Sequence, residues 1–346
     1  MDSLAHPQQS KLVYPDVSAA AKVAYLESRR AHAGGMVQTT GTHMSWVFLT
    51  ERYVYKLKKP VRYPHLDFST IDARHRNCEL EVNLNRRLAG DVYIGVVPLT
   101  VSTQGELSLD GGGKPVDYLV LMRRLGEDHA LEHIIRNRLK CRPDLCRTAA
   151  LLARFYERSA PIEIGLSEYR GRFEFSIEAN RRALLNPIYG LPRNAVRDVS
   201  ADLLEFVNGQ AELLNQRVHQ NRLIEAHGDL RPAHIYLRPH PAIIDCLEFK
   251  RDLRLLDIAD DLAFLALECE RRGAESVGST FLQVYSRITD DRPDQKLLRF
   301  YKSCHAYTRA RLATAHLDDP AVHDKERWQR QATDYLRLAQ EHIRAC

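Results

Sequence analysis

The 346-residue sequence predicts an α+β protein with two lobes: a small N-terminal lobe around a β-sheet with one main helix, and a larger, mainly α-helical C-terminal lobe. β-branched and aromatic residues alternate with turn residues through 36–61 and 106–122. From 144 onward, apolar residues instead recur at helical spacing, with one β-like interruption at 227–249. The change follows Arg123-Arg124-Leu125-Gly126, so we expect domains at 1–125 and 126–346.

In the N-terminal lobe we expect helices over 18–32 and 71–89, and strands within 36–61, 106–109 and 116–122. The second helix places Leu80, Leu84 and Leu88 on one stripe. A triple glycine, Gly111 to Gly113, separates the last two strands. Because a strand and not a helix follows these glycines, they indicate a hairpin turn rather than a phosphate-binding loop.

The C-terminal lobe should consist of long helices around a brief β insertion. The apolar periodicity predicts helices over 144–159, 196–221, 256–272, 275–288, 294–317 and 322–345. Between the second and third of these, 227–237 and 242–249 are predicted as short strands.

The composition excludes several classes of protein. Hydrophobic residues make up 44% of the chain and charged residues 27%, as in ordinary globular proteins. The formal net charge is only +5, which argues against a dedicated nucleic-acid binder; the local basic excess between Arg52 and Arg62 fits a phosphate site better. No apolar run reaches the ~18 residues of a membrane span, and the N-terminus does not resemble a secretory signal. We therefore expect a cytoplasmic protein without a membrane partner.

The cysteines and histidines do not form a metal or disulfide pattern. Seven cysteines without a CxxC pair indicate reduced thiols. His129 and His133 have helical i, i+4 spacing, but no further ligands lie nearby in the sequence, which favours surface or capping roles.

The β insertion carries the strongest chemical signal. Asp229 lies in His227-Gly228-Asp229-Leu230, and the next apolar segment supplies Asp245. Two such carboxylates suit phosphoryl transfer, in which one accepts the proton of the attacking hydroxyl and the other holds Mg²⁺ against the phosphates. Taken alone, Asp245 could equally cap a strand end, and Glu248 could be a second acid at the metal or a surface residue.

A basic strand in the N-terminal lobe supplies the matching cations. Strand alternation places Lys56 and Lys58 on one face, opposite Leu57. A phosphate-binding lysine needs a carboxylate to hold it, and the following helix offers Glu79 and Glu81. Glu81 precedes Leu84 by one turn and is the better candidate. Taken alone, Lys56 reads more simply as a solvated edge-strand lysine.

Together these motifs resemble the aminoglycoside phosphotransferase-like (choline-kinase-like) branch of the protein-kinase-like superfamily. The resemblance rests on VYKLKK at 54–59, HGDL at 227–230 with His234, and IID at 243–245; the stretch 256–263 is similar to the D-P-x-x-D-L-A of that branch. It covers about residues 36 to 312 in the same order, and it implies a two-lobe protein-kinase-like fold.

The resemblance also implies roles for the main site residues. Asp229 would be the catalytic base and Asp245 the main Mg²⁺ ligand. Lys56, paired with Glu81, would bind the phosphates of ATP. Asp257 and Asp261 would anchor the catalytic loop through hydrogen bonds.

Two further groups would contact the nucleotide. The segment from Thr42 through His43 to Ser45 resembles the loop that covers the phosphates in an uncharacterised subgroup of this branch. Leu121 and Met122 would present backbone groups to adenine at the connector between the lobes.

The sequence departs from the family pattern at three places. His234 stands where the family usually has a metal-binding Asn, and Mg²⁺ prefers oxygen ligands; His234 would then contact the metal through water, touch a phosphate, or mark a weakened site. The phosphate loop has only Gly41. Cys246-Leu247 replaces the Phe-Gly of D-F-G, which argues against a flipping activation loop.

We therefore expect an ATP- and Mg²⁺-dependent phosphotransferase acting on a hydroxyl of a small molecule. The alternative is a degenerate kinase-like module that binds nucleotide, or nothing, without catalysis. Protein phosphorylation is less favoured, because the sequence shows neither D-F-G nor A-P-E. The identity of the acceptor and the oligomeric state are not readable from the sequence.

Overall fold

The computed structural model describes residues 14–63, 66–319, 322 and 324–346. The chain divides into two compact units. The first runs to Gly126 and includes Glu248–Lys250; the second comprises Glu127–Leu247 and Arg251–Cys346. The first contains the antiparallel sheet and the second is mainly helical, which confirms the predicted α+β class.

A six-stranded antiparallel sheet forms the centre of the first unit. Its order is β1 (Gln38–Gly41), β2 (Ser45–Leu49), β3 (Tyr53–Lys58), β8 (Lys114–Arg123), β6 (Tyr93–Val101) and β7 (Leu107–Leu109). A separate hairpin pairs β4 (Arg62–Tyr63) with β5 (Leu66–Asp67). Gly111 to Gly113 lie between β7 and β8, so the glycines form a turn between strands, as predicted.

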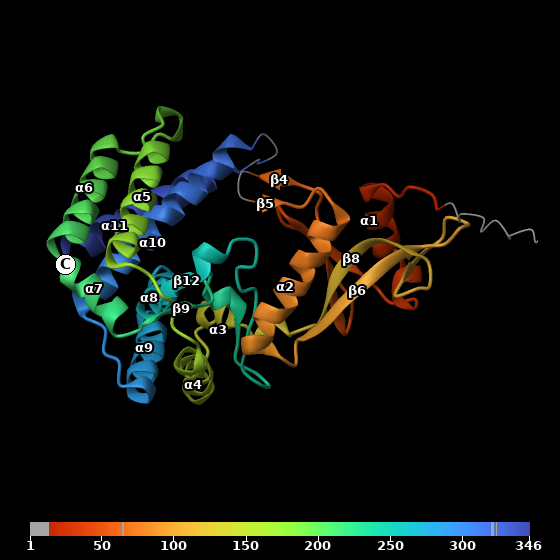
Figure 1. Ribbon diagram of the computed structural model, residues 1–346, viewed down its shortest axis with the longest axis horizontal. Helices are drawn as coiled ribbons and strands as arrows, with labels where there is room; N and C mark the ends of the chain where they lie inside the picture. The colour runs from red at the N-terminus through yellow and green to blue at the C-terminus, as the bar shows by residue number, and fades with distance from the viewer. Residues whose placement is uncertain (1–13, 64–65, 320–321, 323) are drawn as a thin grey trace, which may run out of the picture. The chain divides into compact units, whose positions relative to one another are not determined.

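Two helices pack on this sheet. α1 (Ala19–Glu27), followed by a 3₁₀ turn at Arg29–His32, contributes Leu26 to an apolar core with the sheet, and α2 (Ile71–Ala89) lies along β8 and β6 (Figure 1). Both helices are tied to Asp117 of β8: Lys22 of α1 and Arg74 of α2 each form a buried ion pair with it. The carboxylate therefore links both helices to the same strand.

α2 begins where its sequence predicts but presents a different face. The Thr70 hydroxyl accepts a hydrogen bond from the Ala73 N–H and caps the helix. Leu84 and Leu88 are buried, whereas Leu80 is 39% exposed, so its place on the buried stripe was wrong. The buried face instead carries Glu81 and Asn77, because this side of α2 packs against polar groups of β3 and the 248–250 segment as well as against apolar ones.

The second unit contains nine helices among the residues that the structure describes. They are α3 (Leu131–Arg136), α4 (Arg142–Arg158), α5 (Leu166–Leu184), α6 (Arg193–Gly209), α7 (Ala211–His219), α8 (Ile258–Glu270), α9 (Glu275–Thr289), α10 (Gln295–Ala315) and α11 (Lys325–Arg344). α5, α6, α10 and α11 run side by side and bury the largest apolar core (Figure 1). α8 is buried along almost its whole length.

The short strands of this unit differ from those predicted. β9 (Leu223–Glu225) pairs with β12 (Leu255–Asp257), and β10 (Ile235–Tyr236) with β11 (Ala242–Ile243). The predicted strand over 227–237 is mostly loop, with a 3₁₀ turn at Pro232–His234. Gly228 has a φ of +80°, and Pro232 has no N–H for a strand ladder, so the chain cannot stay extended here.

Two other elements depart from the sequence prediction. The helix predicted over 196–221 is two helices, α6 and α7, separated at Gly209 and Gln210, where Gln210 leaves the helical conformation. α5 and β6 were not predicted at all. All seven cysteines are free thiols. No helix in the described part of the chain is both long and apolar enough to cross a membrane.

Candidate active site

A cluster of four charged side chains lies on the α2 side of the sheet, in the first unit. Lys56 Nζ lies 2.8 Å from Glu81 Oε1, and Lys58 Nζ contacts Glu81 Oε2. Lys58 Nζ also lies 2.5 Å from Glu248 Oε1, which the 248–250 segment contributes to this unit. We call Lys56, Lys58, Glu81 and Glu248 the lysine cluster. Its two ammonium groups and two carboxylates balance in charge.

Burial and charge act against each other at Lys58. Its side chain and that of Glu81 are each 1% exposed. Burial by itself lowers the pKa of Lys58, but the carboxylates of Glu248 and Glu81 outweigh it and raise the pKa above the usual value of 10.5. Lys58 is therefore a fixed cation, and both lysines use Glu81 as a common partner. The predicted choice of Glu81 over Glu79 agrees with these contacts: Glu79 lies on the exposed side of α2, where it pairs with His75.

The predicted phosphate loop is the tight turn between β1 and β2. The Thr42 hydroxyl accepts hydrogen bonds from the N–H of Ser45 (3.0 Å) and of Met44 (3.3 Å). The Thr42 N–H donates to the Ser45 carbonyl, which closes the turn. His43 is exposed at the tip, whereas Ser45 is buried. The turn is therefore held by its own side chain and not by a run of glycines.

Leu121 and Met122 lie inside β8 rather than at a connector. Leu121 pairs with Tyr55 of β3 and Gly95 of β6, so neighbouring strands flank it on both sides. The ladder continues to Arg123, and the backbone N–H of Arg124 donates to Arg52. The structure thus places both predicted residues within the sheet, and their contact with a base stays a prediction.

The second unit positions its acidic residues through a hydrogen-bonded loop. Asp261, near the start of α8, accepts the backbone N–H groups of His227 and Gly228, each at 3.1 Å, and the Tyr156 hydroxyl at 2.8 Å. This anchoring agrees with the role predicted for Asp261. Asp257 does not bond the loop. It pairs with buried Arg217 and caps α8.

His227 holds the same loop from inside the unit. Its ring is fully buried; Nε2 donates to the Ile244 carbonyl at 2.9 Å, and Nδ1 accepts from the Asp229 N–H at 3.3 Å. Both contacts require the neutral ring, and burial lowers the pKa of His227 below 6.5. His227 therefore fixes the strand before Asp245 and the backbone of Asp229 relative to each other.

His234 lies between the two predicted acids. Its Nδ1 lies 2.9 Å from the Asp229 carbonyl, which can only accept, so Nδ1 carries the proton. Its Nε2 accepts from the Arg231 guanidinium at 3.0 Å and lies 3.4 Å from Asp245 Oδ2. Arg231 also pairs with Asp229 Oδ2 at 2.7 Å. We call Asp229, Arg231, His234 and Asp245 the acidic loop; with a neutral histidine it carries one net negative charge.

The acidic loop fits a cation held jointly by protein and substrate. Asp245 is 43% exposed and has a φ of 60°, a left-handed conformation that Asp and Asn tolerate better than other side chains. Its Oδ2 lies 3.4 Å from His234 Nε2, but that nitrogen already accepts from Arg231, so a cation shared by the two atoms would have to displace the guanidinium. Among the described residues no group of three or more such ligands assembles a complete metal cage. A cation here would take water or phosphate oxygens as its remaining ligands, as Mg²⁺ does in nucleotide sites.

Comparison with known proteins tests the resemblance. No family model matches the sequence. Uncharacterised proteins of Mycobacterium tuberculosis (strain ATCC 25618 / H37Rv) and Mycobacterium bovis are 31% identical over 283 residues, which is 78% of this chain and 53% of theirs. The chain thus spans about half the length of the curated relatives it matches.

Solved structures share the fold over nearly the whole chain. A choline/ethanolamine kinase family protein from Mesorhizobium loti has a TM-score of 0.54 at 15% identity and covers 94% of this chain and 99% of its own. Aminoglycoside 2'-phosphotransferase-IIIa, solved with GDP, has a TM-score of 0.52 at 14% identity, with the same coverage. The ethanolamine kinase of Plasmodium vivax has a TM-score of 0.50 at 11% identity and covers 89% of this chain and 83% of its own. This chain has the fold of the aminoglycoside phosphotransferase-like kinases. The resemblance predicted from the sequence is confirmed at the level of fold.

Within this kinase-like fold, the site includes three residues, Lys58, Arg231 and Glu248, to which the sequence analysis assigned no definite role. Lys58 carried a detectable signal, since it shares a strand face with Lys56. Arg231 also had a signal in the sequence, because it lies two residues after Asp229 in the loop that carries the predicted base. Glu248 was noted only as a second acid or a surface residue, and its contact with Lys58 joins residues 190 positions apart, which local patterns do not reveal.

Proposed function

We propose that the chain is a phosphotransferase that moves a phosphoryl group from ATP, in the presence of Mg²⁺, to a hydroxyl of a small molecule. The observation that carries the proposal is the acidic loop: one hydrogen-bonded loop holds Asp229 and Asp245 on either side of His234. The kinase-like fold supports this reaction class. The structural neighbours that are named as kinases of ethanolamine or phosphotransferases of aminoglycosides support a small-molecule acceptor.

The proposed step assigns one task to each residue. Asp229 accepts the proton of the acceptor hydroxyl while the hydroxyl oxygen bonds to the γ-phosphorus. The bond from that phosphorus to the oxygen that bridges to the β-phosphate breaks, which releases ADP. Arg231 holds Oδ2 of Asp229, which leaves Oδ1 for the hydroxyl. Asp245 and His234 would hold the metal ion, which supplies charge neutralisation for the phosphates.

The lysine cluster would bind the phosphates from the first unit. Lys56 is the candidate because its side chain is 14% exposed, against 1% for Lys58. Glu81 holds the Lys56 ammonium group through an ion pair of 2.8 Å. Thr42, His43 and Ser45 would cover the phosphates through the turn between β1 and β2.

Nucleotide binding by calorimetry, with and without Mg²⁺, tests the proposal. We expect Mg²⁺-dependent ATP binding that weakens at least tenfold in Asp245→Asn and in Lys56→Met. Asp290→Asn is a matched control, because Asp290 is exposed and has a similar positive φ of 53°. Lys114→Met, an exposed lysine of β8, controls for the second variant. Equal losses in variants and controls, or no ATP binding at any Mg²⁺ concentration, would contradict the proposal.

One observation favours the second candidate, a kinase-like module without catalysis. Arg231 pairs with the proposed base, and His234 replaces the usual Asn. If these residues disable the site, nucleotide binding should not depend on Mg²⁺, and His234→Asn should create activity. If they take part in the reaction, His234→Asn should reduce it.

A further inference from the structure

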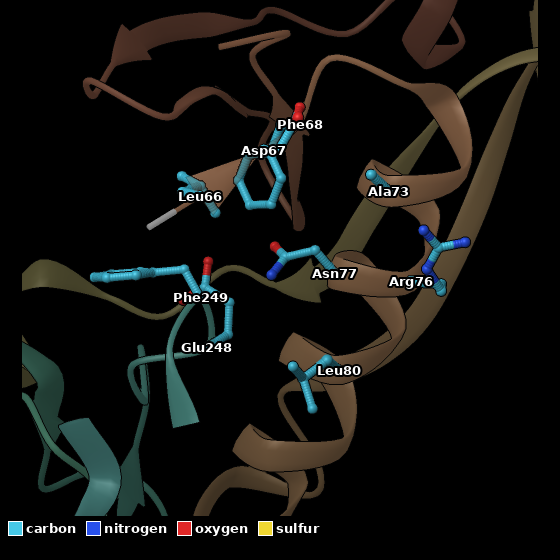
Figure 2. A pocket seen from close by; sticks show the side chains of 9 residues that line it. All are labelled: Leu66, Asp67, Phe68, Ala73, Arg76, Asn77, Leu80, Glu248 and Phe249. Carbon is cyan, nitrogen blue, oxygen red and sulfur yellow. The ribbon is translucent and has the colours of Figure 1, made fainter. Parts of the chain in front are cut away.

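A pocket of about 260 Å³ lies in the first unit beside α2 and shares Glu248 with the lysine cluster. Its wall contains four large apolar side chains, Leu66, Phe68, Leu80 and Phe249. Figure 2 shows Leu66 and Phe249 together on one side and the α2 side chains on the other. Lys56, Glu81, Thr42, Leu121 and Met122 do not line it.

One polar group in this pocket has no partner. Asn77 is 8% exposed, and its Oδ1 makes no hydrogen bond within the described chain. Figure 2 shows its amide pointing into the space between Phe68 and Glu248. Leaving a buried carbonyl oxygen unpaired is unfavourable, so a hydrogen-bond donor that entered the pocket would be stabilised there.

Two of the other polar residues of the wall are acidic. Asp67 and Glu248 contribute carboxylates, and Lys58 Nζ already lies 5.8 Å from the centre of the Phe68 ring, which shows that this ring accommodates a cation. Arg76 is the one cationic side chain of the wall, and its guanidinium points away from the Asn77 amide (Figure 2). An apolar wall that also holds two carboxylates and an unpaired carbonyl oxygen fits a compact apolar body that carries a protonated amine.

We infer that this pocket is an effector site for a small organic amine, whose ammonium group donates to Asn77 Oδ1 and faces Glu248. Glu248 also holds Lys58, which shares Glu81 with Lys56. An ammonium in the pocket adds a positive charge beside a charge-balanced cluster, and so favours a polyphosphate bound at Lys56. Because coupling between two sites is reciprocal, the nucleotide must raise the affinity for the amine by the same factor.

The amine site itself is tested with three probes of one shape: phenethylamine, 2-phenylethanol and phenylacetate. Calorimetry should show phenethylamine binding at least tenfold more tightly than phenylacetate, with the alcohol between them. Asn77→Leu should weaken phenethylamine at least tenfold. Leu80→Lys places a competing cation in the wall at an exposed position of α2 and should have the same effect. Leu312→Lys is the matched control, since Leu312 is 40% exposed and Leu80 39%.

Equal binding of amine and carboxylate, or unchanged amine binding in both Asn77→Leu and Leu80→Lys, would overturn the inference. The coupling rests on the function proposed above and is measured separately, as ATP affinity with and without phenethylamine. ATP affinity should rise severalfold in the wild type and not in Asn77→Leu. Amine binding that Asn77→Leu abolishes, in a protein that binds no ATP, would support the site and contradict the proposed function. ATP binding that phenethylamine leaves unchanged would overturn the coupling.

Discussion

The lysine cluster and the acidic loop hold similar charges but neutralise them in different ways. In the lysine cluster, one buried and one partly buried ammonium group meet two carboxylates, and the charges cancel within the protein. In the acidic loop, Asp229 is 24% and Asp245 43% exposed, and Arg231 is the one positive charge among its four members. The first arrangement is complete without a ligand, whereas the second leaves one negative charge for a cation to balance.

Because of this difference in charge balance, substitutions in the two regions should affect different properties, the folding stability in one case and the activity in the other. Removing one member of a buried, balanced cluster leaves an unpaired charge in the interior, which is strongly destabilising. Removing a carboxylate from a partly exposed, net-negative loop relieves repulsion and costs little folding free energy. We therefore expect substitution of Lys58, whose side chain is 1% exposed, to destabilise the first unit, and substitutions in the acidic loop to abolish chemistry in a folded protein.

The largest effect is expected for Asp229→Asn. Asn keeps the size of the side chain and an acceptor for Arg231, but it cannot take the hydroxyl proton. Phosphoryl transfer should fall about 10²–10⁴-fold, measured as ADP release with a panel of small alcohols or with water as the acceptor. Melting temperature and ATP affinity should stay near the wild-type values. A melting temperature of Asp229→Asn far below the wild-type value would contradict the view that the acidic loop serves activity and not stability.

Lys58→Met tests the contribution of the lysine cluster to the stability of the first unit. It leaves Glu81 and Glu248 buried with one ammonium fewer, so the first unit should lose about 3–5 kcal/mol of stability. The two tryptophans allow this to be measured in one unit: with Trp328→Phe as the background, Trp46 on β2 reports urea unfolding of the first unit.

Two further variants sharpen that result. Lys58→Met combined with Glu248→Leu should recover part of the loss, because the carboxylate that lost its partner is also removed. Lys114→Met, on the exposed part of β8, should leave the urea midpoint unchanged. An unchanged midpoint in Lys58→Met would mean that water or a rearranged Lys56 compensates the carboxylates, and that the cluster is not a closed unit.

A smaller effect is expected for the metal preference of the acidic loop. An imidazole nitrogen suits Mn²⁺ better than Mg²⁺, whereas an amide oxygen suits both. His234→Asn should therefore lower the ratio of Mn²⁺ to Mg²⁺ affinity, measured by calorimetry with ATP present, by about tenfold or 1.4 kcal/mol. If the ratio does not change, His234 acts on the loop through Asp229 and Arg231 and not on the ion.

Local sequence patterns predict most members of both regions, but they do not predict the contact made by Glu248. Strand alternation and helical spacing are local, and they were enough to place Lys56, Lys58 and Glu81 together. The acidic loop was found from a short motif in which Asp229 and Asp245 are 16 positions apart. Glu248 joins the lysine cluster from much farther along the chain, and no periodicity encodes such a contact.

The two elements that the sequence analysis did not predict, β6 and α5, also have weak local patterns. β6 contains Gly95 and Pro98, which are unusual within a strand; irregular register near both residues lets β8 pair with it nonetheless. α5 buries few of its residues, Tyr169 and Ile177 among them, so its helical stripe is weak. In both cases tertiary packing decides the structure over a faint local pattern.

The last and smallest effect concerns pH, and it again divides the two regions. His227, which holds the acidic loop, is neutral in the folded protein, and burial lowers its pKa below 6.5. Below about pH 6.5 the unfolded chain therefore binds more protons than the folded one, and the free energy of unfolding falls as the pH drops. The pKa of Lys58 is raised above 10.5, so Lys58 stays charged across this range. Acid should therefore loosen the second unit through His227 and leave the charge of Lys58 unchanged. Urea unfolding at pH 5.5 and 7.5, read from Trp328 fluorescence with Trp46→Phe as the background, measures this loss of stability, and His227→Gln should flatten the pH dependence.

His305 provides the control of opposite sign. Burial lowers the pKa of His305, but the Asp260 carboxylate outweighs burial and raises the pKa above 6.5, so the contribution of His305 to stability is lost as the pH rises. If His227→Gln and His305→Gln change the pH dependence in the same direction, the loop is not held by a neutral histidine.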